Sequence, residues 1–126
     1  MVDFRLTEEQ MMIRDMARQF SEEEVLPHAE EWDREGTYPR DAITKAHELG
    51  LLNVTIPEKY GGAGMSTVDE MVICEELSRG DPGFGTASYH TMLASFPILT
   101  GGTEEQKEEY LGRVTEGKLA AYCVTE

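Results

Sequence analysis

Hydrophobic and polar residues follow one another along most of the chain with the spacing of amphipathic helices. A capping box predicts the start of the first helix, because Thr7 and Gln10 can each accept a hydrogen bond from a backbone amide there. Apolar residues then recur at i, i+3, i+4 and i+7, which places on one helix face Ile13, Met16, Ala17 and Phe20. The pattern predicts an amphipathic helix that begins after Thr7.

Capping residues mark the starts of the later helices. Thr103 repeats the capping box with Gln106, Ser66 precedes an apolar run, and the pair Asp81-Pro82 suits an N-cap and a first turn. Proline also suits the helix start near Pro39, and glycines that suit helix ends stand at Gly36, Gly50 and Gly117.

Two prolines interrupt helical patterns. Pro27 cannot donate a backbone hydrogen bond, so we expect a break near Glu24 to Leu26. The run from Phe84 to Leu99 contains no Lys, Arg, Asp or Glu and predicts a buried central helix, which Pro97 ends or kinks. At about 16 residues it is shorter than the roughly 20 that a membrane span needs.

The fold class that follows is all-α, a bundle of about five to six helices joined by short turns. The last segment, Ala120 to Thr125, reads instead as a strand. A single strand leaves its backbone groups without partners, so we expect a further domain beyond it.

Charge narrows the function classes. The chain has 11 basic and 25 acidic residues and a net charge of -14, which disfavours nucleic acid and anionic membranes as partners and suits a salt-adapted source. Cys74 and Cys123 are expected to be reduced, buried thiols. The N-terminus shows no secretory signal, and we expect a cytoplasmic protein.

Candidate chemistry is sparse. Gly61 to Gly64 lacks the spacing of a dinucleotide loop and predicts a turn. No His lies in a Glu-x-x-His or HExxH pattern, so no metal site is expected, and His90 alone stands inside the apolar helix. The acidic runs Glu22–Glu24 and Glu75–Glu76 are expected to form solvated helix faces, and no nucleophile–base set is found.

Five phrases, in order, resemble the acyl-CoA dehydrogenase family. They are LTEEQ (6–10), ELGLL (48–52), IPEKYGGAG (56–64), EELSRGDPG (75–83) and GTEEQKEEYLGRVTEGKLAAYCVTE (102–126). YLGR followed by AYCVTE is most similar to the medium- and short-chain enzymes. The resemblance covers nearly the whole chain.

The resemblance implies an oxidoreductase of fatty acid metabolism, a flavoprotein in which FAD accepts a hydride from an acyl-CoA. Residues 1–119 would be its N-terminal helical domain, and residues 120–126 the first strand of a missing middle FAD-binding β-barrel domain. Implied partners are the acyl-CoA substrate, an electron-transferring flavoprotein, the missing C-terminal domains and further copies in a homo-oligomer.

The same resemblance assigns site residues. Cofactor binding falls to Tyr122, Cys123, Val124, Thr125 and Glu126, which match the opening of the FAD segment. The helix that lines the acyl pocket corresponds to Phe84–Phe96, with facing positions at Gly85, Thr86, Tyr89 and Leu93. An inward Tyr89 would shorten the acyl tunnel and favour short or branched chains. The family's catalytic carboxylate lies in the C-terminal domain, so no catalytic residue is assigned here and we expect the fragment alone to be inactive.

Two alternatives stay open. A free-standing helical interaction module could use the same apolar faces and the terminal strand to bind another protein. Flavin monooxygenases and nitroalkane oxidases share the family architecture, and the parts that separate them lie downstream.

Overall fold

The computed structural model describes residues 4–124, and all regular secondary structure in this part of the chain is helical. The α-helices are α1 (Glu8–Phe20), α2 (Ala29–Glu35), α3 (Arg40–Glu48), α4 (Thr67–Gly80), α5 (Pro82–Gly101) and α6 (Glu104–Thr115). Shorter turns are η1 (Ser21–Val25), η2 (Leu26–His28) and η3 (Glu58–Tyr60). The predicted all-α bundle is confirmed.

The helix starts lie where the sequence predicts them. Thr7 and Thr103 each accept a hydrogen bond from a backbone amide three residues later, and their capping boxes are complete. Ser66 forms a third box with Asp69, and Asp81 accepts from Phe84 N at 2.7 Å. These caps satisfy amides that helices otherwise leave without partners.

The two prolines, Pro27 and Pro97, affect their helices differently. Before Pro27 the helix widens into the π turn η1 and then tightens into the 3-10 turn η2, so the predicted break is confirmed. Pro97 does not end α5, because the helix continues to Gly101. The proline costs one backbone hydrogen bond near the helix end, where few turns follow it.

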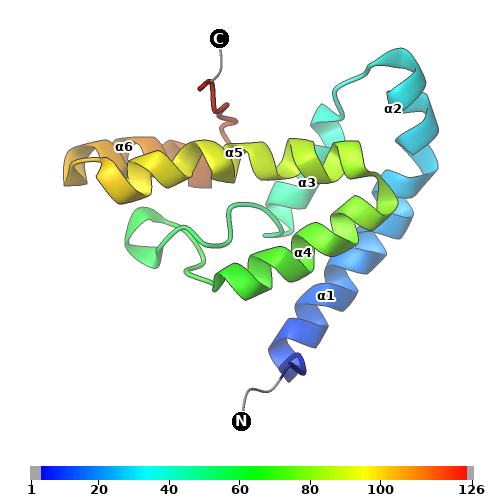
Figure 1. Ribbon diagram of the computed structural model, residues 1–126, viewed down its shortest axis with the longest axis horizontal. Helices are drawn as coiled ribbons and strands as arrows, with labels where there is room; N and C mark the ends of the chain where they lie inside the picture. The colour runs from blue at the N-terminus through cyan, green and yellow to red at the C-terminus, as the bar shows by residue number, and fades with distance from the viewer. Residues whose placement is uncertain (1–3, 125–126) are drawn as a thin grey trace.

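Helix α1 packs on α4, α4 on α5 and α5 on α6, and Figure 1 shows these neighbours side by side. Three hydrogen-bonded pairs join α1 and η1 to α4: Gln10–Asp69, Arg18–Glu76 and Glu22–Arg79, separated by 59, 58 and 57 positions. Since the separation hardly changes along the helices, α1 and α4 run in the same direction.

Two hydrophobic clusters form the core. The larger lies among α1, α3, α4 and the start of α5, where Phe84 stacks on Trp32 at 6.0 Å between ring centroids and lies 6.1 Å from Phe20. The smaller joins α5 and α6 to the segment before η3 and contains Ile56, Tyr60, Met92, Leu111 and Val114. Among residues 4–124, no helix is both long enough and apolar enough to cross a membrane.

One expectation stays untested and one is wrong. Ala120 to Val124 form no ladder within the described residues, where no second strand is available to them, so the strand of a further domain stays a prediction. Glu76 is not on a solvated face: it is 5% exposed and receives two hydrogen bonds from the Arg18 guanidinium. This pairing compensates the cost of burying the carboxylate and lowers the pKa of Glu76.

Candidate functional site

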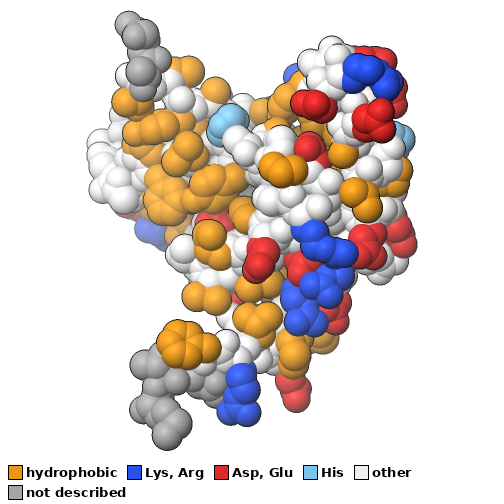
Figure 2. Space-filling model, turned by 45° about the vertical axis from the view of Figure 1, so that its right-hand side comes forward, with side chains coloured by type: hydrophobic (Ala, Val, Ile, Leu, Met, Phe, Trp, Pro, Cys, Tyr) orange, Lys and Arg blue, Asp and Glu red, His pale blue; other side chains and the backbone are white. Residues whose placement is uncertain are grey.

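Helix α5 has one face in the core and one face exposed, although it carries no Lys, Arg, Asp or Glu between Phe84 and Leu99. Its buried positions include Phe84, Ser88, Met92 and Ser95. On the exposed side, Leu93 and Phe96 keep 36% and 38% of their surface. Exposed apolar side chains on a helix are found at ligand walls and at interfaces. Figure 2 shows hydrophobic side chains gathered over the upper left of one face of the molecule.

Gly85 is placed against the neighbouring helix. A Cβ built on this residue would overlap Ser78 Oγ and would stand 3.0 Å from Ser78 Cα. Glycine therefore allows α4 and α5 to approach closely at this point. This packing accounts for Gly85, and its predicted role in an acyl pocket stays a prediction.

The other three predicted acyl-pocket residues are more accessible. Thr86 is exposed, and its hydroxyl donates to Pro82 O at 2.9 Å, which fixes the side chain on the helix surface. Leu93 is exposed two turns further along, and Tyr89 between them is half-buried. Thr86, Tyr89 and Leu93 follow at intervals of three and four residues, so they share one side of α5.

Tyr89 also borders a polar group inside the fold. Burial raises the pKa of its phenol, and the charges of Glu70 and Cys74 raise it further. Burial likewise raises the pKa of the Cys74 thiol to about 11 and raises that of the Glu70 carboxyl. In all three groups the fold therefore favours the protonated, uncharged form over the charged form.

Glu70 was missed by the sequence analysis, although a pattern could have found it. Ile73, Cys74 and Leu77 stand three, four and seven residues after it, so Glu70 occupies the first position of the buried stripe of α4. Glu70 is 4% exposed. An acidic residue on such a stripe indicates a buried carboxyl.

The predicted cofactor segment is only partly described. Tyr122, Cys123 and Val124 are exposed, while Thr125 and Glu126 lie outside the described residues. The last hydrogen bond before the segment is from Ala120 N to Thr91 Oγ1, at 3.3 Å. Within the described residues, the backbone of residues 121–124 makes no hydrogen bond. The role of this segment in cofactor binding stays a prediction.

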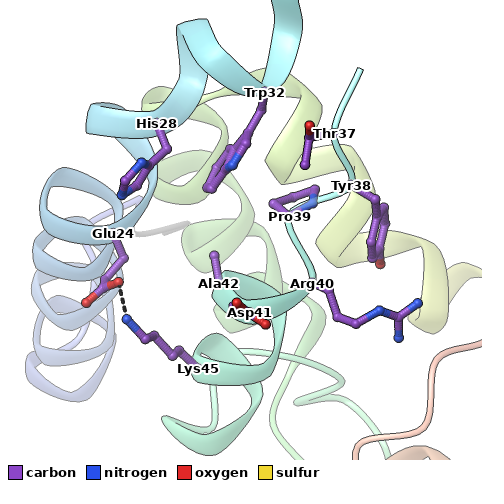
Figure 3. A pocket seen from close by; sticks show the side chains of 10 residues that line it. All are labelled: Glu24, His28, Trp32, Thr37, Tyr38, Pro39, Arg40, Asp41, Ala42 and Lys45. Atoms are coloured by element: carbon purple, nitrogen blue, oxygen red, sulfur yellow. Dashed lines mark hydrogen bonds and ion pairs between the residues drawn. The ribbon is translucent and has the colours of Figure 1, made fainter. Parts of the chain in front are cut away.

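A surface cleft of about 370 Å³ lies between η1, α2 and α3 (Figure 3). Lys45 Nζ is 2.6 Å from Glu24 Oε2 there, and the rings of His28 and Trp32 stack with centroids 5.5 Å apart. These side chains are occupied by contacts with each other that hold the helices together. We assign the cleft a structural role.

The histidines and cysteines named in the sequence analysis form no site within the described residues. His90 is exposed, and His47 is half-buried beside Gly117. Cys74 and Cys123 are free thiols, but Cys74 is half-buried and Cys123 exposed, so neither is buried as expected. Residues 4–124 contain no group of three or more His, Cys, Asp or Glu side chains able to hold a metal ion.

The comparison with known proteins agrees with this fold. Residues 7–118 match the model of the acyl-CoA dehydrogenase N-terminal domain. A probable medium-chain specific acyl-CoA dehydrogenase 2, mitochondrial, from Caenorhabditis briggsae is 44% identical over 126 residues, which are 99% of this chain and 31% of that protein.

Solved structures agree as well. A structure described as the electron transferring flavoprotein of Acidaminococcus fermentans superposes with a TM-score of 0.85 at 40% identity, over 92% of this chain and 31% of that one. The acyl-CoA dehydrogenase of Bacillus anthracis, complexed with FAD, gives 0.88 at 36% identity, over 100% of this chain and 22% of that one.

The helical fold with its half-exposed, uncharged α5 is therefore that of a dehydrogenase domain. The chain belongs to the acyl-CoA dehydrogenase family, of which residues 7–118 form the N-terminal domain. It spans about a third of the length of the curated relative described above.

Proposed function

We propose that this chain is the N-terminal domain of an FAD-dependent acyl-CoA dehydrogenase and supplies one wall of its acyl and flavin site. The observation that supports the proposal most strongly is the uncharged face of α5, left open in a domain of this family. An apolar wall suits an acyl chain, because hydrocarbon gains free energy when it leaves water for such a surface.

In this proposal Gly85, Thr86, Tyr89 and Leu93 lie along the acyl chain. Tyr89 sets the depth of the tunnel and thereby favours short or branched acyl groups. Residues 120–126 begin the FAD-binding β-domain, with Tyr122 to Glu126 against the cofactor, and residues 1–119 are the helical domain. When bound, FAD supplies the hydride acceptor for oxidation of the acyl α,β carbons.

No residue of this chain is proposed as the catalytic base, which we assign to the C-terminal part of a complete enzyme. We further propose an electron-transferring flavoprotein as electron acceptor, a homo-oligomeric enzyme and a cytoplasmic location. The unpaired Cys74 and Cys123 support a reducing compartment. Alone, the chain is expected to bind FAD weakly and to be inactive.

A second candidate is a free-standing interaction module. It is favoured by exposed apolar residues on α5 and the chain end, where Leu93, Phe96, Leu119 and Val124 keep 36%, 38%, 42% and 65% of their surface. The same residues would contact the other domains of a dehydrogenase.

The test is to purify the protein from its natural source with an antibody to this domain, and to record its mass and absorption spectrum. A mass about three times that of this chain, with a flavin spectrum that acyl-CoA bleaches, is expected. A mass of 14.1 kDa without flavin would favour the interaction module.

A further inference from the structure

Lys118 differs from the other lysines of this acidic chain, because its side chain forms no ion pair and no hydrogen bond within residues 4–124. The other lysines each lie within 3.2 Å of a carboxylate oxygen: Lys45 of Glu24, and Lys59 and Lys107 both of Glu104. Lys118 is therefore the lysine whose ammonium group no carboxylate holds.

An ion pair lowers the reactivity of a lysine, because only the neutral amine is a nucleophile and a carboxylate stabilises the charged form. Lys59 shows the effect: its hydrogen bonds with Tyr60 and Glu104 raise the pKa of its ammonium group. Lys118 has neither kind of partner in the described chain. Its amine is thus less restrained than those of the paired lysines.

The backbone around Lys118 is held in place, although its side chain is exposed. Lys118 N donates to Arg113 O at 3.1 Å, and Gly117 N donates to Val114 O at 3.0 Å. The ring of His47 packs on Gly117, where an added Cβ would stand 2.9 Å from the ring. Lys118 therefore extends from a fixed point on the wall of a surface pocket of about 410 Å³, between α3 and the segment that follows α6.

Arg40 lines the same pocket and also has no carboxylate partner within the described residues. From Arg14 to Arg113, the other basic residues all form ion pairs. The Arg40 guanidinium lies over the Tyr38 ring at 5.7 Å from its centroid, and Figure 3 shows it pointing away from Lys45. Stacking occupies a face of the guanidinium and leaves its N–H edges available to an anion.

The pocket is less repulsive to an anion than the chain as a whole. The net charge of -14 repels an anionic thioester such as an acyl-CoA. In the pocket, the charges of Arg40 and Lys118 balance those of Glu48 and Glu116. Leu119, which is 42% exposed, adds an apolar wall on which an acyl group can pack.

We propose that Lys118 is a site of covalent acylation by acyl-CoA thioesters. The ammonium group first gives a proton to solvent, and the neutral amine then attacks the thioester carbonyl carbon. A C–N bond forms, the C–S bond breaks, and the CoA thiolate leaves and takes up the second proton of the amine. The products are an amide on Lys118 and free CoA, so no oxidant or further reactant is needed. The inference rests on the proposed function only for the supply of the thioester.

The test is to incubate the complete protein with acetyl-CoA at about pH 8, where more of each amine is neutral, and to follow each lysine by quantitative peptide mass spectrometry. Acetyl-CoA has no β carbon, so a dehydrogenase cannot oxidise it. We expect Lys118 to be acetylated about two- to fivefold faster than Lys45 and Lys59, the factor that corresponds to an exposed ion pair. A rate equal to or below theirs would overturn the proposal.

Two variants separate the causes. Glu24→Gln removes the partner of Lys45, so the acetylation rate of Lys45 is expected to rise toward that of Lys118; an unchanged rate would contradict the role of pairing. Arg40→Gln is expected to slow Lys118 by about two- to fivefold, because the phosphates of CoA lose a nearby cation. Arg34→Gln, at an exposed position of α2, is the matched control and should leave Lys118 unchanged. Equal rates in both arginine variants would rule out the role of Arg40.

The proposed function is tested separately in the same preparation, by bleaching of the flavin with a longer acyl-CoA. Bleaching without preferential acetylation of Lys118 would overturn the acylation site alone. Preferential acetylation without a flavin would leave the site in place and count against the dehydrogenase.

Discussion

The phenolic hydroxyl of Tyr60 donates to Glu104 Oε2 at 2.9 Å, although the two residues are 44 positions apart. Lys59 Nζ lies 3.0 Å from the same oxygen, and Lys107 Nζ lies 3.2 Å from Glu104 Oε1. Hydrogen bonds from Lys59, then Tyr60 and Lys107, lower the pKa of Glu104 to about 2. The carboxylate thus joins η3 to the first turn of α6.

This lowered pKa makes the domain sensitive to acid. A carboxyl with a depressed native pKa stabilises the fold above its unfolded pKa, here 4.5, and the contribution is lost as the pH falls through about 2. Glu104→Gln is therefore expected to lower the Tm at pH 7 and to leave it nearly unchanged near pH 2. Thermal unfolding followed by circular dichroism measures both. Glu108→Gln, at an exposed position of α6, is the control; equal losses in both variants would refute the prediction.

Glu70 is expected to change the stability of the fold in the opposite direction, with a loss as the pH rises. Its pKa is raised in the fold by burial, so the native state holds the proton to higher pH than the unfolded chain. The stabilisation is complete below the unfolded pKa and is lost as the pH rises through the folded pKa.

Glu70→Gln removes this titration. Its Tm relative to wild type is expected to increase from pH 5 to pH 8, while exposed Glu75→Gln gives no such trend. A Tm difference that stays constant with pH would show that Glu70 does not titrate in this way.

The close contact between α4 and α5 predicts the effect of a methyl group. Gly85→Ala places a Cβ 2.9 Å from Ser78 Cβ as well as against its hydroxyl, so the helices must separate. Overpacking of this kind costs about 1–3 kcal/mol. Gly101→Ala on the same helix meets no atom within 4 Å and is expected to stabilise by up to about 1 kcal/mol. Urea unfolding measures both, and equal effects would contradict the packing argument.

The proposed acyl wall predicts a change in substrate preference. In the complete enzyme, Tyr89→Gly is expected to raise kcat/KM for longer acyl-CoA thioesters relative to short ones by about tenfold or more, because removal of the ring lengthens the tunnel. Tyr89→Phe keeps the ring and should keep the native preference. An unchanged chain-length profile in Tyr89→Gly would exclude the role.

Local features of the fold could be predicted from the sequence. Thr7, Ser66, Asp81 and Thr103 each bind an amide three residues away, so the whole interaction lies inside a short phrase. The break at Pro27 is local for the same reason. The family phrases likewise identified the class of domain.

Features that depend on residues far apart in the sequence could not be predicted from the sequence. The burial of Glu76 requires Arg18, which lies 58 positions away, and adjacent acidic residues give no hint of it. The burial of Glu70 likewise needs α4, α5 and the turn at Asn53 to meet. The roles of the α5 residues and of the C-terminal segment came from the family resemblance, since a pocket wall and a core helix share one apolar pattern.

The parallel course of α1 and α4 has a consequence for folding kinetics. Antiparallel helices can pack together across a short turn. Helices α1 and α4 can pack only after the long connection through α2, α3 and η3 has brought their starts to the same end of the domain. Closing a loop of this length slows folding and costs chain entropy. The local capping hydrogen bonds do not offset this cost, because they form without closing the loop. A chain cut within that connection would leave two pieces, and the domain would then assemble at a rate proportional to the product of their concentrations.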